Sequence, residues 1–308
     1  MHEHDGGDRA GRGHGVHGGG AVSARLPASE PKAEAPRGRT ERRCIAAETE
    51  QIVAAGRYRA PDGREVSLAA EIQAARDGTR MLGPEPVSVS QKGGTGVDTV
   101  VEVTGESSLE AARRLAGAPV AVLNFASARN PGGGFLNGAQ AQEEALCRAS
   151  ALYTCLLTAR SFYDHHLAHR DPFYTDRVIH SPAVPVFRDD RGRLLAEPYL
   201  VGFLTAAAPN AGVVRRTQPE RAAELPGALA VRAERVLETA AAHGYRRLVL
   251  GAWGCGVFQN DPAQVAEAFR ALLGPGGRFA RTFAHVVFGV LDRTPGAVVR
   301  EAFTRVFP

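Results

Sequence analysis

The feature that most constrains this chain is a short apolar segment followed by three consecutive glycines. Residues 120–125 read VAVLNF, a length and composition typical of a buried strand. Gly132, Gly133 and Gly134 follow shortly after it. Because glycine has no Cβ, its backbone can approach another group more closely than that of any other residue. This stretch therefore predicts a strand that ends in a loop suited to close contact.

A helix with two adjacent glutamates follows the loop. Asn137 and Gln140 have the spacing of a capping box, which predicts that the helix begins there. Apolar residues then recur at helical spacing on one face, which we expect to be packed in the core: Leu146, Ala149, Tyr153 and Leu156. Glu143 and Glu144 would lie in the second turn and point about 100° apart. We therefore expect the two carboxylates to have different roles.

A second strand, glycine-rich loop and helix occur near the C-terminus. Residues 248–250 are an apolar strand, and residues 251–260 read GAWGCGVFQN. Asp261, Pro262 and Gln264 then provide an N-cap, a proline at the first helical position and a capping-box partner. Backbone N–H groups and the helix dipole favour phosphate binding at such a loop. Two such loops at adjacent strand ends would form one cleft at the carboxyl edge of a sheet.

The known nucleotide-binding signatures do not fit these loops. The chain has no GxxxxGK[ST] motif, and Gln259 replaces the last glycine of a GxGxxG motif that begins at Gly254. A structural turn is therefore the alternative for each loop taken singly. Both loops together, with acidic residues behind one of them, favour a phosphate-bearing ligand.

Composition excludes several classes of protein. Residues 1–40 are rich in Gly, Arg, His, Ala and Pro without periodicity, which predicts a disordered tail. No apolar run approaches the ~18 residues of a membrane span, and the N-terminus lacks the apolar core of a signal peptide. We therefore expect a cytoplasmic protein without a membrane partner.

The four cysteines are scattered, so neither a disulfide framework nor a zinc site is indicated, and we expect no metal. The net charge of +4 is too small to indicate nucleic acid.

Strands and helices alternate over the rest of the chain. We expect helices at 43–56, 69–77, 109–115, 219–243, 261–273 and 295–303, the fourth of them interrupted or bent near Pro226 and Gly227. We expect a hairpin at 58–68 and strands at 99–103, 178–179, 184–187, 199–205, 248–250 and 285–291. This alternation favours an α/β layered domain with a parallel or mixed sheet.

The glycine loop and the glutamates together resemble the poly(ADP-ribose) glycohydrolases. Gly132–Gly134, followed after seven residues by QEE at 142–144, matches the signature of that family. The segments LNFAS at 123–127, YTDR at 174–177, SPAVPVF at 181–187 and GCGVF at 254–258 are similar to its compact bacterial branch. The resemblance covers about residues 42–308 and leaves the N-terminal tail unexplained.

The resemblance implies a three-layer α/β/α macrodomain with a mixed central sheet and an N-terminal helical extension. Residues 1–40 would be the tail and 41–308 the catalytic domain, with the extension at about 41–97. Glu144 would be the catalytic acid and base, and Glu143 would hydrogen-bond ribose hydroxyls. The other implied ligand-binding residues come from the two loops and the start of the helix: Asn130, Gly132, Gly133, Gly134, Gln142, Gly254, Cys255, Gly256, Val257 and Phe258.

The implied reaction is hydrolysis of the ribose–ribose O-glycosidic bond of poly(ADP-ribose), without a cofactor. Its transition state resembles an oxocarbenium ion, and one glutamate would serve as general acid and then as base. The sequence has no room for the regulatory domain and tyrosine-bearing loop of the animal enzymes, which favours trimming from the polymer end. We expect a monomer that acts on poly(ADP-ribose) and ADP-ribosylated proteins and releases ADP-ribose.

Two other functions stay open. One is a non-catalytic macrodomain that binds ADP-ribose, and the other is a hydrolase of mono-ADP-ribose. Single residues also have alternatives: Phe258 could belong to the core, and Cys255 is better explained as a small residue in a tight turn than as a reactive thiol. Trp253 is expected in packing, while Tyr174 could line the cleft or brace the fold.

Overall fold

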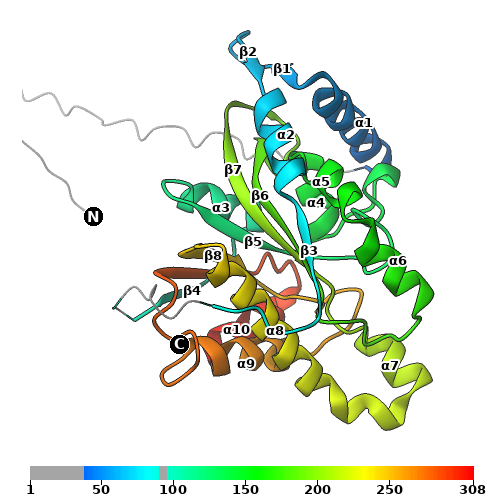
Figure 1. Ribbon diagram of the computed structural model, residues 1–308, viewed down its shortest axis with the longest axis vertical. Helices are drawn as coiled ribbons and strands as arrows, with labels where there is room; N and C mark the ends of the chain where they lie inside the picture. Colours follow the sequence, from blue (N-terminus) through cyan, green and yellow to red (C-terminus); the bar gives the residue numbers. More distant parts are fainter. Residues whose placement is uncertain (1–37, 90–95, 97) are drawn as a thin grey trace, which may run out of the picture. The chain divides into compact units, whose positions relative to one another are not determined.

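A seven-stranded mixed sheet forms the centre of the chain (Figure 1). The structure is a computed structural model that describes residues 38–89, 96 and 98–308. The strand order is β3-β6-β7-β5-β8-β9-β4. The bounds are β3 Arg80–Leu82, β4 Val100–Thr104, β5 Val120–Phe125, β6 Val178–Arg188, β7 Leu194–Ala206, β8 Arg247–Leu250 and β9 His285–Gly289. Strands β7, β5, β8, β9 and β4 run parallel, whereas β6 is antiparallel to both of its neighbours.

Helices cover both faces of this sheet, so the predicted layered α/β/α fold is confirmed. The helices are α1 Arg39–Ala55, α2 Ala69–Gly78, α3 Ser108–Leu115, α4 Gln142–Ala149, α5 Leu152–Thr158, α6 Arg160–Ala168, α7 Ala211–Thr217, α8 Leu225–Ala242, α9 Pro262–Leu273 and α10 Val298–Val306. One core contains side chains of α1 to α6, and a second contains those of α8, α9 and α10. In Figure 1, α1, α4 and α5 accordingly lie together and away from α8, α9 and α10.

Strand β5 belongs to both cores. Val120 and Val122 contact the first core, and Ala121 and Leu123 contact the second. All four are at most 1% exposed. Burial on both faces explains why this strand is a continuous apolar run rather than an alternating one.

The N-terminal segment adds more than helices to the domain. Helix α1 ends at Gly56 in the left-handed conformation, as predicted, and is followed by the predicted hairpin of β1 (Arg57–Arg59) and β2 (Glu65–Ser67). Strand β3, which we did not predict, pairs with β6 and so forms one edge of the central sheet. Thr49 of α1 donates a hydrogen bond to the carbonyl of Arg148 at 2.7 Å, which fixes α1 against α4.

Two predictions along the chain are wrong in detail. The three short strands expected between 178 and 205 are parts of two long antiparallel strands, β6 and β7, with register shifts after Ser181 and Val186. The helix expected at 219–243 is interrupted near Pro226, as predicted, but its first part, Pro219–Glu224, is a 3₁₀ segment, and only α8 is α-helical. Pro226 does not break α8, because it lies in the first turn, where its missing N–H leaves no hydrogen bond unmade.

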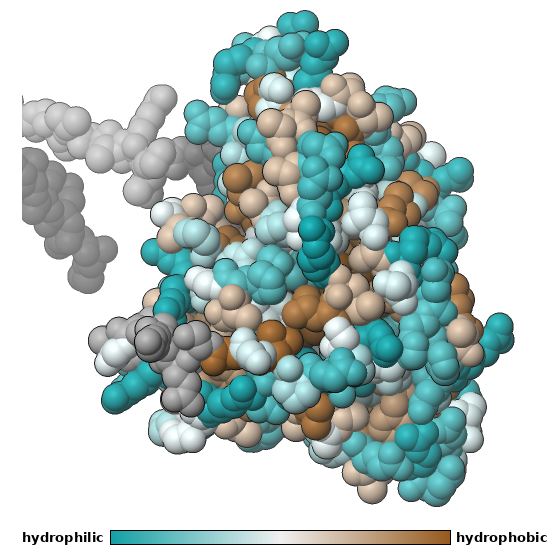
Figure 2. Space-filling model, viewed as in Figure 1, coloured by the Kyte–Doolittle hydropathy of each residue, from teal (hydrophilic) through white to brown (hydrophobic). Residues whose placement is uncertain are grey.

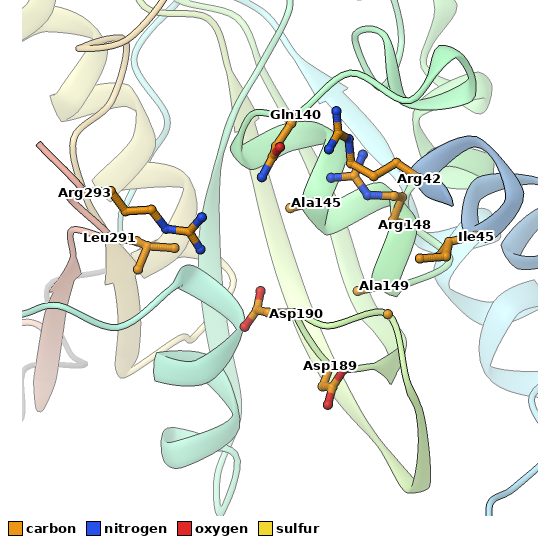
Figure 3. Close-up of a pocket in the computed structure, with 11 residues that line it drawn as sticks. Arg42, Ile45, Gln140, Ala145, Arg148, Ala149, Asp189, Asp190, Leu291 and Arg293 are labelled. Atoms are coloured by element: carbon orange, nitrogen blue, oxygen red, sulfur yellow. The ribbon is translucent and has the colours of Figure 1, made fainter. Parts of the chain in front are cut away.

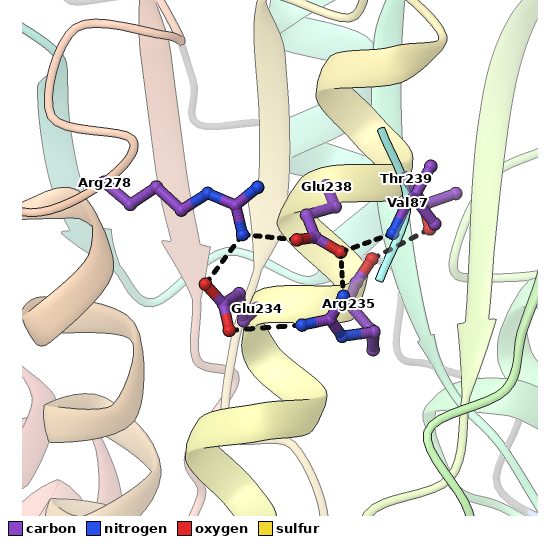
Figure 4. A network of polar contacts seen from close by, with 6 residues as sticks. All are labelled: Val87, Glu234, Arg235, Glu238, Thr239 and Arg278. Atoms are coloured by element: carbon purple, nitrogen blue, oxygen red, sulfur yellow. Dashed lines mark hydrogen bonds and ion pairs between the residues drawn. The ribbon is translucent and has the colours of Figure 1, made fainter. Parts of the chain in front are cut away.

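A buried ionic network joins α8 to two other segments (Figure 4). Glu238 is fully buried, and its carboxylate forms ion pairs with Arg235 and Arg278. It also accepts the backbone N–H of Val87 at 2.9 Å. Since both oxygens are engaged, the desolvated charge is compensated. The network thereby holds the segment after β3 and the loop after α9 against α8.

The surface is mixed in character. On the face in Figure 2, hydrophobic residues form separate small patches among hydrophilic ones. None of the described helices combines the length and the apolar composition that a bilayer crossing requires.

Candidate active site

The glutamates lie at the very start of α4. We predicted a capping box at Asn137 and Gln140, and this is wrong. Residues Phe135–Asn137 form a 3₁₀ turn that ends at Gly138, whose φ is 73°. Because this left-handed residue ends the turn, α4 begins only at Gln142, and no side chain caps it. The glutamates are therefore in the first turn rather than the second, where the helix dipole favours negative charge most.

Gln142 anchors this first turn to the sheet. Its Oε1 accepts the backbone N–H of Phe125 at 2.9 Å, and its Nε2 donates to the carbonyl of Leu123 at 2.8 Å. The same Nε2 donates to Oγ of Ser108, at the start of α3, at 3.1 Å. The side chain predicted to bind ligand thus also positions α4 at the carboxyl end of β5.

Glu143 is enclosed by the protein. Its side chain accepts hydrogen bonds from Nδ2 of Asn124 at 3.2 Å and from the backbone N–H of Ser127 at 2.7 Å. The residue is only 2% exposed. Desolvation raises the pKa of Glu143 to about 8, against the lowering effect of the hydrogen bonds from Ser127 and Asn124. Glu143 therefore fixes the loop after β5 and gains a proton far more readily than an exposed glutamate.

This raised pKa predicts a pH-dependent stability. The folded pKa of about 8 lies above the ~4.3 of an unfolded glutamate, so folded protein holds the extra proton between these values. The contribution to stability is complete below pH ~4.3 and is lost as the pH rises to 8. We expect Glu143→Gln to flatten this decline, which has a slope of up to ~1.4 kcal/mol per pH unit. Urea unfolding of both proteins between pH 5 and 8 checks this, and parallel curves would contradict it.

Glu144 has one engaged and one unengaged carboxylate oxygen. Its Oε1 accepts the backbone N–H of Gly134 at 3.0 Å. Its Oε2 is buried, and no hydrogen-bond partner contacts it within the described part of the chain. The residue as a whole is 9% exposed. A desolvated carboxylate oxygen without a partner is unfavourable in a folded protein, and it is available to a substrate.

The three glycines are required by their contacts with these side chains. Gly132 and Gly133 have φ values of 66° and 58°, which favour glycine. A Cβ at Gly133 would overlap the carboxylate of Glu144 and would lie 3.2 Å from Oε2 of Glu143. A Cβ at Gly132 would lie 2.9 Å from the ring of Tyr153. We predicted that the backbone of this loop comes close to another group. Part of that close contact is with the side chains of the two glutamates. Asn130 lies at the exposed start of the turn, and its carbonyl accepts the N–H of Gly133 at 3.0 Å.

The second glycine loop follows β8, the direct neighbour of β5 in the sheet. Gly254 has a φ of 70°, and a Cβ there would lie 2.5 Å from Nδ2 of the buried Asn260. The predicted N-cap of α9 is confirmed, because Asp261 accepts the backbone N–H groups of Ala263 and Gln264. Trp253 is 1% exposed and donates from Nε1 to the carbonyl of Ala206 at 3.0 Å, so it packs in the core as expected.

The tip of this loop is open. Val257 is 83% exposed, and a Cβ at Gly256 would meet no atom within 4 Å. No contact within the described protein therefore requires glycine at position 256. Burial raises the pKa of the Cys255 thiol to about 12, which argues against a reactive thiolate and for the small-residue interpretation.

Tyr174, in the segment between α6 and β6, contacts residues near both glycine loops, which the sequence did not predict. Tyr174 has a φ of 57°, an unfavourable conformation for a bulky residue, and its ring lies 5.8 Å from that of Phe258. The guanidinium of Arg129 lies over the Tyr174 ring at 5.9 Å. Arg129 precedes the first glycine loop, and its Nε is buried without a partner among the described residues. Phe258 is partly buried at the margin of the second core, with its ring against that of Tyr174.

Asp176 braces the fold instead of lining the site. Its carboxylate accepts from Nε of Arg232 at 2.9 Å. Arg232 is 2% exposed and also donates to the carbonyls of Phe173 and Ala207.

The buried Asn124 is a candidate functional residue that we did not predict from the sequence. A polar residue within an apolar strand was the signal that could have indicated it.

The mixed sheet, its helical layers and the glycine loops at its carboxyl edge define a macrodomain-like α/β protein with a glutamate-bearing site. Residues 46–189 match the family model described as the catalytic domain of microbial-type PARG, that is, poly(ADP-ribose) glycohydrolase. None of the curated proteins matches the chain. The chain belongs to the poly(ADP-ribose) glycohydrolase family, as the solved structures show most directly.

Three solved structures illustrate this similarity. The poly(ADP-ribose) glycohydrolase of Thermomonospora curvata is 53% identical, with 87% of this chain and 100% of that chain covered and a TM-score of 0.82. The same enzyme bound to the inhibitor ADP-HPD is 54% identical, with 86% and 99% covered and a TM-score of 0.80. The enzyme of Deinococcus radiodurans in complex with ADP-ribose is 44% identical, with 79% and 98% covered and a TM-score of 0.70.

Proposed function

We propose that this protein hydrolyses the ribose–ribose O-glycosidic bond of poly(ADP-ribose) and releases ADP-ribose. The observation that carries the proposal is the carboxyl group of Glu144 beside the glycine loop, whose buried Oε2 has no hydrogen-bond partner among the described residues. A protein that only binds ADP-ribose has no need of such a carboxyl group. The complexes of the related enzymes with ADP-ribose and with ADP-HPD support the same class of ligand.

Glu144 is the proposed general acid and base. In its protonated form, the carboxyl group donates its proton to the departing ribose oxygen as the glycosidic bond breaks. The positive charge that develops on the anomeric carbon is stabilised by the diphosphate of the substrate. The carboxylate of Glu144 then takes a proton from the attacking water, which restores the acid.

Glu143 and the glycines position the ribose. Each carboxylate oxygen has two lone pairs, so Glu143 can accept from a ribose hydroxyl while it keeps its bonds to Ser127 and Asn124. Because the glycines have no side chains, the sugar can pack directly over the loop at Gly133. The proposed role of Phe258 is to contact the terminal ribose, and its contact with Tyr174 holds its ring in place.

The second loop is the proposed diphosphate site. The residues predicted for it, Gly254, Cys255, Gly256 and Val257, include an exposed tip at the last two positions. Backbone N–H groups there can point at an anion, and the following helix α9 adds the positive end of its dipole.

We further propose that the protein cleaves the polymer mainly at its end. The monomeric state and the cytoplasmic location are predictions from the sequence.

The test is a direct comparison of substrates. The protein is incubated side by side with labelled poly(ADP-ribose) and with a mono-ADP-ribosylated protein, and the products are separated. We expect ADP-ribose as the main early product from the polymer, with little loss of the protein-linked label. Release from the mono-modified protein alone would favour the mono-ADP-ribosyl hydrolase, and binding without any release would favour a non-catalytic macrodomain.

A further inference from the structure

A cavity of about 100 Å³ lies on the far side of α4 from Glu143 (Figure 3). On α4 it is lined by Ala145, Arg148 and Ala149, which lie on roughly the opposite face of the helix from Glu143. The remaining walls come from α1, from the turn between β6 and β7, and from the loop after β9. The cavity is too large for a single water, whose share of liquid volume is ~30 Å³, and has room for a compact oxyanion.

Three arginines from three separate elements line this cavity. Arg42 belongs to α1, Arg148 to α4 and Arg293 to the loop after β9. Figure 3 shows the guanidinium groups of Arg42 and Arg148 side by side, while that of Arg293 points toward the cavity from the other side. The fold thus brings three cations, far apart in the sequence, to the walls of one small space.

The two acids in the lining do not pair with Arg148 or Arg293. Asp189 accepts the backbone N–H groups of Arg191 and Arg193 and forms an ion pair with the Arg193 side chain at 2.7 Å. Asp190 accepts from Oγ of Ser107 at 2.6 Å; burial raises the pKa of its carboxyl group, while this hydrogen bond and the charge of Arg293 lower it. Neither acid forms an ion pair with the Arg148 or Arg293 side chain anywhere in the described part of the chain.

Arg148 is the strongest sign that an anion is required. The residue is only 8% exposed, and its side chain makes one hydrogen bond, from Nη1 to the carbonyl of Ala139 at 2.6 Å. Burial, and then the charge of Arg42, lower the pKa of this guanidinium, whereas the charge of Glu144 raises it. A guanidinium has five N–H donors, and a buried cation that forms no ion pair with an acid of the described residues is unfavourable. An anion in the adjoining cavity would satisfy both its charge and its free donors.

We propose that this cavity is an anion site that binds a phosphate group through Arg148 and Arg293, with Arg42 contributing further positive charge. Arginine is the residue best suited to phosphate, because its planar fork of donors matches two oxygens at once. Cations that approach from several directions fit a tetrahedral anion better than a flat carboxylate. The phosphate has two possible sources, a diphosphate linkage elsewhere in the polymer or free phosphate in solution.

Both sources are compatible with the position of the cavity. Gln140, Leu291 and Arg293 line it and are exposed, so the cavity can be entered from solvent. It is separated from Glu143 by the body of one helix, ~10 Å across, which a neighbouring unit of a bound polymer could span, whereas Glu144 lies one helical turn from Arg148. The polymer source rests on the proposed function, whereas the binding of phosphate itself does not.

The test is a calorimetric titration with inorganic phosphate at constant ionic strength. The wild type is compared with Arg148→Met, Arg293→Met and the control Arg305→Met, an exposed arginine of α10. We expect each of the first two variants to weaken phosphate binding about tenfold or more, as charged hydrogen bonds are lost, and the control to leave it unchanged. All four proteins have the same glycine loops, so phosphate bound there contributes equally to each titration. A difference in phosphate affinity between the wild type and a lining variant therefore comes from this cavity.

Two results would overturn the proposal. The first is that Arg148→Met and Arg293→Met both bind phosphate with the affinity of the wild type. The second is that the wild type binds no phosphate. If Arg148→Met does not fold, because its bond to Ala139 is lost, the exposed Arg293→Met decides the question alone.

Polymer kinetics then identify the source. A raised KM for polymer in Arg293→Met, with kcat and ADP-ribose affinity unchanged, supports the polymer diphosphate. Unchanged polymer kinetics with weakened phosphate binding support free phosphate, and both results support the site. An enzyme inactive on polymer would refute the proposed function and still leave the phosphate titration interpretable.

Discussion

Glu144→Gln is expected to lower the turnover of poly(ADP-ribose) by about 10²–10⁴-fold, the usual contribution of general acid–base catalysis. Glutamine has the shape of glutamate but cannot donate an acidic proton to the departing ribose oxygen. Its amide oxygen can still accept the backbone N–H of Gly134, so the loop should keep its position. The binding of ADP-ribose should therefore be close to that of the wild type.

Initial rates on labelled polymer and calorimetric titration with ADP-ribose measure these two quantities separately. The matched control is Glu267→Gln, the same substitution at an exposed position on α9. It should leave both quantities unchanged. Near-normal turnover by Glu144→Gln would show that another group supplies the proton, and the catalytic assignment would have to be abandoned.

Gly133→Ala is expected to damage both activity and stability. Position 133 has a φ of 58°, and the added Cβ would overlap the carboxylate of Glu144. The strained backbone alone costs about 1–3 kcal/mol, and relief of the overlap requires Glu144 or the loop to move. Because Glu144 would no longer hold its position relative to the bound sugar, we expect turnover to fall even in the fraction that remains folded.

Gly256→Ala is the control for this prediction. Its Cβ would meet no protein atom within 4 Å, so we expect unchanged stability. Urea unfolding gives the stability of each variant, and initial rates on polymer give the activity. If the proposed diphosphate site is correct, Gly256→Ala weakens ADP-ribose binding without loss of stability. Wild-type stability and turnover in Gly133→Ala would be inconsistent with the contact between Gly133 and Glu144.

Local signals in the sequence predicted the individual elements well. The left-handed Gly56 ends α1, Asp261 caps α9, and the apolar run at 120–125 is a strand buried on both faces. Each of these features depends on residues that are neighbours in the chain, so each can be read from the sequence. The failed capping box at Asn137 shows the limit, because the nearby Gly138 ended the turn first.

The site was predicted in its composition but not in its contacts. The adjacent positions of Glu143 and Glu144 on a helix were enough to predict that they differ. The sequence could not show that Glu143 would be held by Asn124 and Ser127, while one oxygen of Glu144 has no hydrogen-bond partner in the part of the chain that the structure describes. The strained Tyr174 beside Phe258 was equally invisible, since it joins segments that lie far apart in the chain.

By itself, the sequence determined most of the strands and helices, although not β3, α6 or α7, together with the two glycine loops and the pair of glutamates that indicated the family. Only the tertiary structure decided that β3 completes the sheet and that Arg42, Arg148 and Arg293 share one cavity. Turns, caps and periodic patterns are set by interactions over a few residues, and these are written in the local sequence. Strand pairing, desolvation and the meeting of charges depend on which distant segments pack together, and the energy of the whole fold decides that.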